Sequence, residues 1–179
     1  MQKNRDHLLS LGRGLTTLVQ VFLVLGMVGL GIGMAGTATM ALGYLPEGMT
    51  IDMAPENVGS TALWVAALAM LITLCALGLM YDFAKRLGQI IDTVGQGDPF
   101  IMDNADRLTR MAWLAMAVEL VLIPATILSS WAEHNLPEGH FELHSDISLT
   151  GFILAVILFI LARVFRKGAE MRAELEGTV

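Results

Sequence analysis

Charged side chains are scarce in this sequence. Asp, Glu, Lys and Arg make up 16% of its 179 residues, whereas hydrophobic residues make up 55%. In water-soluble domains about a quarter of all residues are ordinarily charged, so the composition argues against a water-soluble protein. We therefore expect an integral membrane protein, for which the lipid bilayer is the main solvent.

Cysteine is almost absent, and the usual catalytic motifs are missing. The single cysteine, Cys75, lies within an apolar stretch, which excludes a disulfide framework and a thiolate metal site. The sequence contains no nucleotide-binding glycine loop, no HExxH and no GxSxG motif. Since no nucleophile, base and oxyanion donors occur in one pattern, we expect a protein that is not an enzyme.

Apolar residues dominate four stretches, each about as long as or longer than the ~20 residues that a spanning helix needs. They are residues 14–44, 61–81, 109–131 and 147–164. The predicted fold is all-α: one membrane domain over residues 1–179, in which four transmembrane helices form an antiparallel bundle. The remaining segments are two outer loops at 45–60 and 132–146, a hairpin at 82–108 and a tail at 165–179.

Lysine and arginine are distributed unevenly over this layout. All 11 lie before the first span, in or beside the hairpin, or in or beside the tail, and the two outer loops have none. Because these cations resist translocation, both termini and the hairpin are predicted to be cytoplasmic.

Amphipathic segments extend the second and fourth helices beyond the predicted spans. Apolar residues recur with helical spacing after Tyr81 and again after Ala162, with charged residues on the rest of each helix. Gly95, Gly97 and Pro99 are predicted to end the second helix. Asp103 or Asn104 is then the predicted N-cap of the third.

Glu119 is the one ionisable residue deep inside a predicted span. At ~1.5 Å per residue, Gln20, Thr73 and Glu119 lie at similar depths, so we expect them in one polar layer. An intramembrane acid can join helices by hydrogen bonds, relay a proton or cation, or sense a ligand. We favour the first role; the second would make the chain a small transporter or an ion-coupled membrane protein.

Three histidines, His134, His140 and His144, lie among acidic residues in the outer loop 132–146. Such a set could hold zinc or copper, or could titrate near neutral pH. A histidine could also be an axial ligand of haem. We favour a solvated acidic loop over a metal- or haem-sensing site, because nothing in the spacing fixes the geometry of ligands.

Small residues recur every four positions in the first span, at Gly29, Gly33, Thr37 and Ala41. This pattern lets another helix approach closely within lipid. The predicted partner is the fourth helix of the same chain or, alternatively, a second copy in a homodimer.

Two short segments carry a resemblance to a known family. They contain Gly97, Pro99, Phe100, Asn104, Arg107 and Leu108, and then Phe165, Gly168, Glu174, Thr178 and Val179. Together they resemble the YoaS-like family of uncharacterised bacterial four-helix membrane proteins. Members of that family are often encoded beside a small Cro-type helix-turn-helix regulator, so the resemblance implies such a partner and the bacterial cytoplasmic (inner) membrane.

These observations lead to one functional hypothesis. The chain is expected to be a non-enzymatic membrane regulator that binds a cytoplasmic helix-turn-helix transcription factor in response to a membrane or extracytoplasmic signal. Direct binding of nucleic acid by the chain itself is not expected. The predicted apolar contacts are Phe83, Leu87, Ile90, Ile91, Phe100, Phe165, Met171 and Leu175, and the residues predicted to set orientation are Arg86, Arg107 and Arg166.

Overall fold

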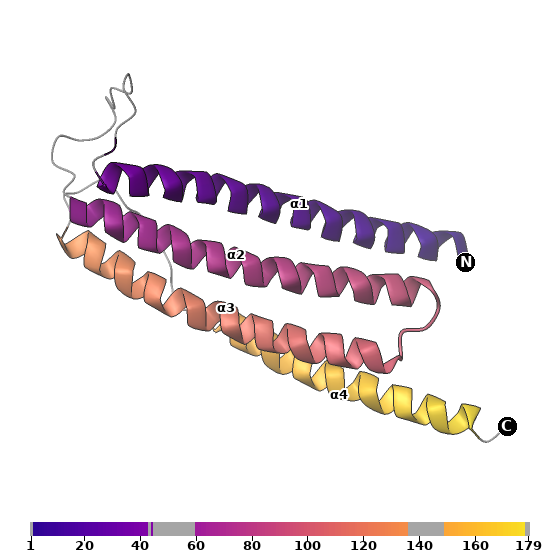
Figure 1. The fold of residues 1–179 in the computed structure, drawn as a ribbon. Helices are drawn as coiled ribbons and strands as arrows, with labels where there is room; N and C mark the ends of the chain where they lie inside the picture. The colour runs from indigo at the N-terminus through magenta and orange to yellow at the C-terminus, as the bar shows by residue number, and fades with distance from the viewer. Residues whose placement is uncertain (1, 43, 45–59, 136–148, 178–179) are drawn as a thin grey trace. The chain divides into compact units, whose positions relative to one another are not determined.

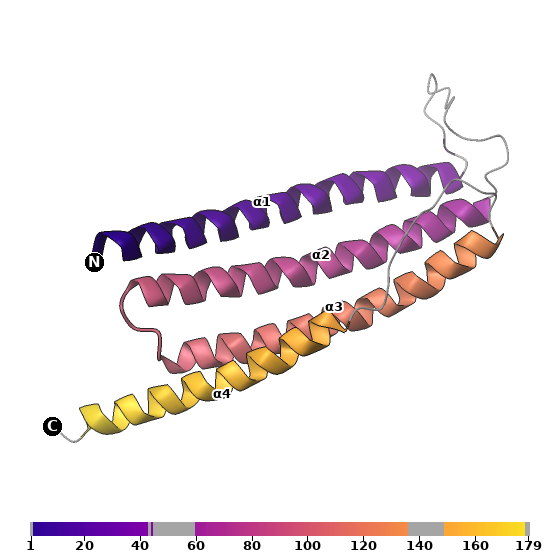
Figure 2. The ribbon, with the colours of Figure 1, turned by 180° about the vertical axis from the view of Figure 1, so that it is seen from behind.

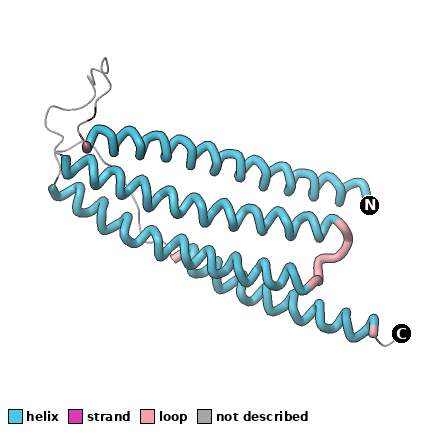
Figure 3. Tube along the Cα trace, viewed as in Figure 1, coloured by secondary structure: helices cyan, strands magenta, loops and turns pink. Residues whose placement is uncertain are grey.

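The computed structural model describes residues 2–42, 44, 60–135 and 149–177, and over these residues the chain is helical with no strand. Its helices are α1 (Gln2–Ala41), α2 (Ser60–Gly95), α3 (Met102–Asn135) and α4 (Thr150–Glu176). They are drawn as a ribbon in Figure 1 and as a tube coloured by secondary structure in Figure 3. The predicted all-α class is confirmed.

The chain divides into two compact units, which are described separately. Unit 1 comprises Met1–Val24, Gly78–Glu119 and Ser148–Val179, and unit 2 comprises Leu25–Leu77 and Leu120–Ile147. Helices α1, α2 and α3 contribute residues to both units, whereas α4 belongs to unit 1.

Three helical segments are long and apolar enough to cross a membrane. They are Leu9–Ala41, Thr61–Gly95 and Met102–Leu128. Large apolar side chains on them are exposed, for example Phe22 at 66% and Ile127 at 66%. Exposed apolar surface of this extent is unfavourable in water and suits contact with lipid chains. The chain is therefore a membrane protein.

Helix α4 is shorter in its apolar part than the other three. The 13 residues from Thr150 to Ala162 precede Arg163, and at ~1.5 Å per residue they extend over about 20 Å. The hydrocarbon core of a bilayer is ~30 Å thick. A fourth span thus requires residues that precede Thr150, and it stays a prediction.

In unit 1 an apolar core joins α2, α3 and α4. Phe83, Phe159 and Phe165 pack around its buried members, which are Ile90, Leu108, Met111, Ala112, Leu158 and Ala162. Helix α1 packs against α2, where Gly12 lies beside Ile91 and Gly88 beside Thr16. Within this unit, Figures 1 and 2 show from opposite sides that α1 lies next to α2 and α4 next to α3.

In unit 2 two residues of the small-residue stripe of α1, Gly33 and Thr37, face α2. A Cβ atom at Gly33 would lie 3.7 Å from the Sδ atom of Met70, and the Oγ1 atom of Thr37 lies 4.0 Å from the same sulfur. At these two positions the close partner is therefore α2, the antiparallel neighbour in sequence, rather than the predicted fourth helix.

One helix begins earlier than predicted. Helix α3 begins at Met102 instead of after an N-cap at Asp103 or Asn104, while α1 begins at Gln2 and so extends on the N-terminal side of the predicted span 14–44. The predicted N-cap was wrong because the Asn104 side chain makes other contacts, which are described below. The continuation of α2 to Gly95 and of α4 to Glu176 agrees with the amphipathic spacing.

The first turn of α4 is capped by a residue of another helix. The residue before it, Leu149, offers no side-chain hydrogen bond. Instead, the backbone N–H of Gly151 donates to Oε1 of Glu119 in α3 over 3.0 Å, which satisfies one of the N–H groups that lack a partner in a first helical turn. A Cβ atom at Gly151 would overlap the Glu119 carboxyl group. Only glycine leaves room for this arrangement.

We expect Gly151→Ala to lower the melting temperature of the detergent-solubilised protein. The added methyl group must displace Glu119 and break the cap, at a cost of about 1–3 kcal/mol. Gly78→Ala is the matched control, because no atom lies within 4 Å of a Cβ at that helical position; alanine there should be neutral or stabilising. Equal melting temperatures for the two variants would contradict the packing at Gly151.

Candidate functional site

The end of α2 is a tight glycine-dependent turn. Gly97 has a φ of 92°, which side-chain-bearing residues rarely adopt. The N–H of Gly97 donates to the carbonyl of Val94 over 3.1 Å, and the N–H of Asp98 donates to that of Thr93 over 3.3 Å. This pair of bonds is the Schellman pattern of helix ends. It reverses the chain within a few residues and brings α3 back along α2.

Asn104 lies at the centre of this turn and is completely buried, with 0% of its surface exposed. Its Nδ2 donates to the Oγ1 of Thr93 over 2.7 Å and to the carbonyl of Pro99 over 3.0 Å. Its Oδ1 accepts from the Nη1 of Arg107 over 2.8 Å. Both halves of the amide are thus satisfied, and the side chain joins α2, the turn and α3.

Helix α4 is attached to the turn by one ion pair and an aromatic contact, and to α3 by a second ion pair. Arg172 pairs with Asp98, and Arg166 pairs with Asp106 over 3.0 Å. The ring of Phe100 packs on Gly168, with its centroid 5.2 Å from that of Phe165. Exposed ion pairs contribute only about 0–1 kcal/mol, so these contacts mainly position the end of α4.

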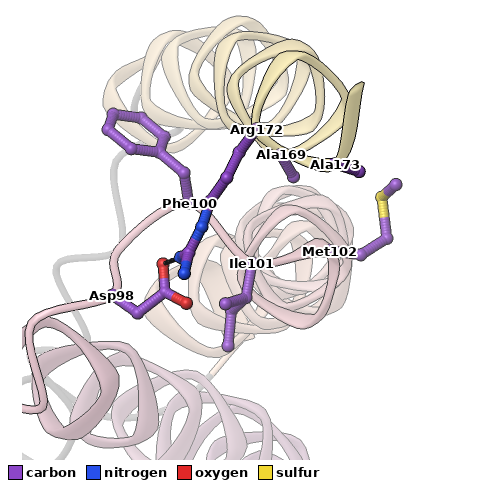
Figure 4. Close-up of a pocket in the computed structure, with 7 residues that line it drawn as sticks. All are labelled: Asp98, Phe100, Ile101, Met102, Ala169, Arg172 and Ala173. Carbon is purple, nitrogen blue, oxygen red and sulfur yellow. Dashed lines mark ion pairs between the residues drawn. The ribbon is translucent and has the colours of Figure 1, made fainter. Parts of the chain in front are cut away.

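An open hollow of about 320 Å³ lies between the turn and α4. Figure 4 shows the Asp98–Arg172 ion pair at one side and Phe100, Ile101 and Met102 along the turn. The α4 side of the hollow is formed by Ala169, Arg172 and Ala173. Its lining therefore combines small and apolar side chains with one ion pair.

The predicted apolar contact residues fall into two groups. The first group is internal: Ile90 is a buried core member, Phe83 and Phe165 pack against that core, and Ile91 contacts Gly12. The second group is exposed: Leu87 at 38%, Phe100 at 43%, Met171 at 49% and Leu175 at 71%. Only the second group is available to a partner.

The three arginines predicted to orient a partner all have contacts within the chain. Arg86 pairs with Asp82 over 2.9 Å on the same helix, Arg107 donates to Asn104, and Arg166 pairs with Asp106. Each of the three arginines therefore has a structural role within the chain. A role of these arginines in orienting a partner stays a prediction.

The three polar residues predicted to form one intramembrane layer have separate neighbours. Glu119 accepts from Gly151, Gln20 lies beside Gly88 on α2, and the hydroxyl of Thr73 donates to the carbonyl of Ala69 on its own helix. Thr73 belongs to unit 2, while Gln20 and Glu119 belong to unit 1. The contact of Glu119 agrees with the interpretation that it joins helices.

The predicted metal, haem or pH-sensing histidines cannot be placed in a site. His140 and His144 lie outside the described residues, and the side chain of His134 is likewise outside the described part. Over the described ranges there is no group of three His, Cys, Asp or Glu side chains that could hold a metal ion.

Several residues of the site were not identified from sequence. The buried amide of Asn104 was interpreted as a helix cap, and Asp98 had no assigned role. Gly151 and Gly168 had no assigned packing role, although each accepts a large neighbour from another helix. One signal in the sequence could have indicated the hydrogen bond between Asn104 and Thr93: the two polar residues lie 11 positions apart, on either side of a Gly-Asp-Pro turn.

We expect Asn104→Asp to destabilise the turn although it retains the acceptor for Arg107. Aspartate loses both Nδ2 donors, and it places an oxygen against the carbonyl of Pro99, so the cost should be about 2–4 kcal/mol. Thermal unfolding in detergent measures the effect. Asp103→Asn is the control in the same helical turn, since that side chain is 76% exposed and its loss should leave the melting temperature nearly unchanged. An equally stable Asn104→Asp variant would show that the bridge is not needed.

Comparison with known proteins identifies a family but no function. A family model described as "Protein of unknown function (DUF2975)" matches residues 35–179. No curated protein and no solved structure matches the chain. The match includes the turn, Asn104, Glu119 and all of α4. The assignment to an uncharacterised family agrees with the resemblance found in the sequence, while the YoaS-like name stays a prediction. Because the model covers well over half of its length, the chain belongs to the DUF2975 family of proteins of unknown function.

Proposed function

We propose that the chain is a non-enzymatic regulator in the inner membrane of a bacterium, with four spans and with both termini and the α2–α3 turn in the cytoplasm. It binds a small helix-turn-helix transcription factor and controls its access to DNA in response to a membrane or extracytoplasmic signal. The supporting observation is a set of exposed apolar side chains on the turn and on the end of α4. We call this set the docking surface; it comprises Phe100, Met102, Met171 and Leu175, exposed by 43%, 46%, 49% and 71%.

The position of the docking surface matters for this proposal. Apolar side chains that face lipid need no partner, but those at the end of the turn and near the C-terminal end of α4 lie among charged residues. Asp98, Asp106 and Arg172 are their neighbours in sequence or across the hollow. Exposed apolar residues rimmed by charge are typical of protein interaction sites.

The docking surface is also held in place before a partner arrives. Asn104 fixes the turn through three hydrogen bonds, and the two ion pairs attach α4 to the turn and to α3. A pre-organised surface loses less conformational entropy on binding than a flexible one. This favours a binding role for the turn over that of a simple connection.

The charge near the docking surface suits a DNA-binding protein. The side chains of Asp103 and Asp106 are 76% and 58% exposed, and DNA-binding proteins carry a basic face. Each acid already pairs with an arginine of this chain, Asp103 with Arg107 and Asp106 with Arg166, so a basic face of the partner would orient by competing for these exposed pairs. Such binding would also occupy the face that contacts DNA, which gives a physical route to regulation.

We expect the double variant Met102→Asp/Leu175→Asp to lose the transcription factor. Burying a carboxylate in place of an apolar contact should weaken binding about tenfold or more. The measurement is co-purification, from detergent-solubilised membranes, of the tagged full chain with a co-expressed Cro-type helix-turn-helix protein, the neighbour that the family resemblance implies. Ile90 is unsuitable for this test because it belongs to the core.

Asp103→Asn serves as the matched control for membrane insertion and yield, because it changes an exposed side chain one residue from Met102 without altering apolar surface. It should reduce co-purification only slightly. Undiminished recovery of the transcription factor with the double variant would overturn the proposed function.

The competing hypothesis is a small transporter or ion-coupled protein that uses Glu119. The hydrogen bond between Glu119 and Gly151 favours a structural role instead. Glutamine retains an oxygen acceptor for the Gly151 N–H, so we expect Glu119→Gln to fold normally and reconstituted vesicles to show no proton flux for either protein. Proton flux in the original chain that disappears in Glu119→Gln would establish the competing hypothesis.

A further inference from the structure

Helices α3 and α4 of unit 1 are joined along one edge by contacts that resemble the rungs of a ladder. Trp113 and Phe159 form one rung, with ring centroids 5.4 Å apart and an edge-to-face geometry. Asp106 and Arg166 form another, with a 3.0 Å ion pair. Each helix advances by seven residues between these rungs, which is two turns. The helices are therefore antiparallel and in register here, as Figures 1 and 2 show.

The rung between these two contains like charges. Arg110 lies three residues before Trp113 and four after Asp106, so it shares their face of α3. Arg163 lies four residues after Phe159 and three before Arg166, so it shares their face of α4. The ladder thus places two arginines opposite each other at the same level, and both are exposed.

The chain supplies no counter-ion for this middle rung within its described residues. Asp106, the acid on the same face of α3, is paired with Arg166. On α4 the residues three and four positions from Arg163 are Phe159, Ile160, Arg166 and Lys167, none of which is acidic. Two arginines at the same level of neighbouring helices repel each other, and an anion bound between their guanidinium groups would remove this repulsion.

The surroundings of the rung indicate which anion it takes. On one side lies Trp113, which is 60% exposed, and the side chains of Ile160 and Val156 on α4 are 61% and 57% exposed. On the other side is the charged pair Asp106–Arg166. Exposed tryptophan next to such a change from apolar to charged surface is typical of the membrane interface, where lipid phosphates lie.

We propose that Arg110 and Arg163 together bind the phosphate of an anionic phospholipid, whose acyl chains lie against Trp113, Ile160 and Val156. Guanidinium groups bind phosphate oxygens through charge-assisted hydrogen bonds, and basic sites between membrane helices hold anionic head groups. The site is separate from the docking surface and does not depend on the proposed regulator. It requires only that this level of unit 1 lies at a membrane surface.

The test uses the fluorescence of Trp113. The sequence has three tryptophans, so Trp64→Phe/Trp131→Phe in the full chain leaves Trp113 as the only one. We reconstitute this protein in two kinds of nanodisc, both made mainly of unlabelled phosphatidylcholine. One kind contains a small fraction of brominated phosphatidylglycerol, and the other contains the same fraction of brominated phosphatidylcholine. Bromine quenches tryptophan on contact, and we expect brominated phosphatidylglycerol to quench Trp113 more strongly, which gives a preference ratio.

The arginine variants assign that preference to the rung. Arg110→Gln and Arg163→Gln should each lower the ratio about fivefold, the contribution of one basic residue near an anionic surface, while Arg163→Lys should retain much of it. Lys167→Gln removes a cation one turn further along α4, where Lys167 pairs with Glu170 over 3.4 Å, and should leave the ratio unchanged. Far-ultraviolet circular dichroism of each variant checks that the helices are intact.

Three outcomes would overturn the proposal. Equal quenching by the two lipids in the parent protein would mean that no anionic lipid is selected. An equal decrease in Lys167→Gln would mean that only the overall charge of the surface matters. The third outcome is that inorganic phosphate abolishes the preference for phosphatidylglycerol where chloride at the same ionic strength does not. That result would mean that Arg110 and Arg163 bind a free anion instead of a lipid.

Discussion

The hydrogen bonds of Asn104 determine how the rest of unit 1 is arranged. A completely buried carboxamide is unfavourable unless every polar atom has a partner. Thr93, Pro99 and Arg107 provide those partners from three different segments. If one segment moved away, the amide would lose a partner without gaining water, so the hairpin of α2 and α3 is restricted to one geometry.

The attachment of α4 follows from this hairpin. At its beginning, Gly151 donates to Glu119, and towards its end Arg166 and Arg172 pair with acids of α3 and of the turn. Between these points the apolar core contributes Leu158 and Ala162. Polar contacts at both ends set the register, and the apolar contacts between them supply the packing. The cap that Glu119 provides for α4 also explains why an acid is compatible with an apolar helical segment.

Much of this architecture could be predicted from local patterns. Helical periodicity and apolar length are properties of short windows, so the four helices, the continuation of α2 to Gly95 and the turn at Gly97 and Pro99 were all predicted. Long-range partners were harder, because no local pattern specifies which helix a small or polar residue meets. The partner of Gly33 was placed on the fourth helix or on a second copy instead of α2, the N-cap of α3 was placed at Asp103 or Asn104, and Ile90 was counted among the contacts to a partner although it belongs to the core. Each of these depends on packing between segments.

The central claim is that the α2–α3 turn is a rigid structural element and not a flexible loop. Amide hydrogen exchange of the full chain in nanodiscs tests it most directly at the N–H groups of Gly97, Asp98 and Asn104, which donate to Val94, Thr93 and Ile101. The account predicts that all three exchange much more slowly than in an unstructured peptide, since opening any of them requires disruption of the buried amide. Exchange at the rate of a free peptide at these positions would contradict it.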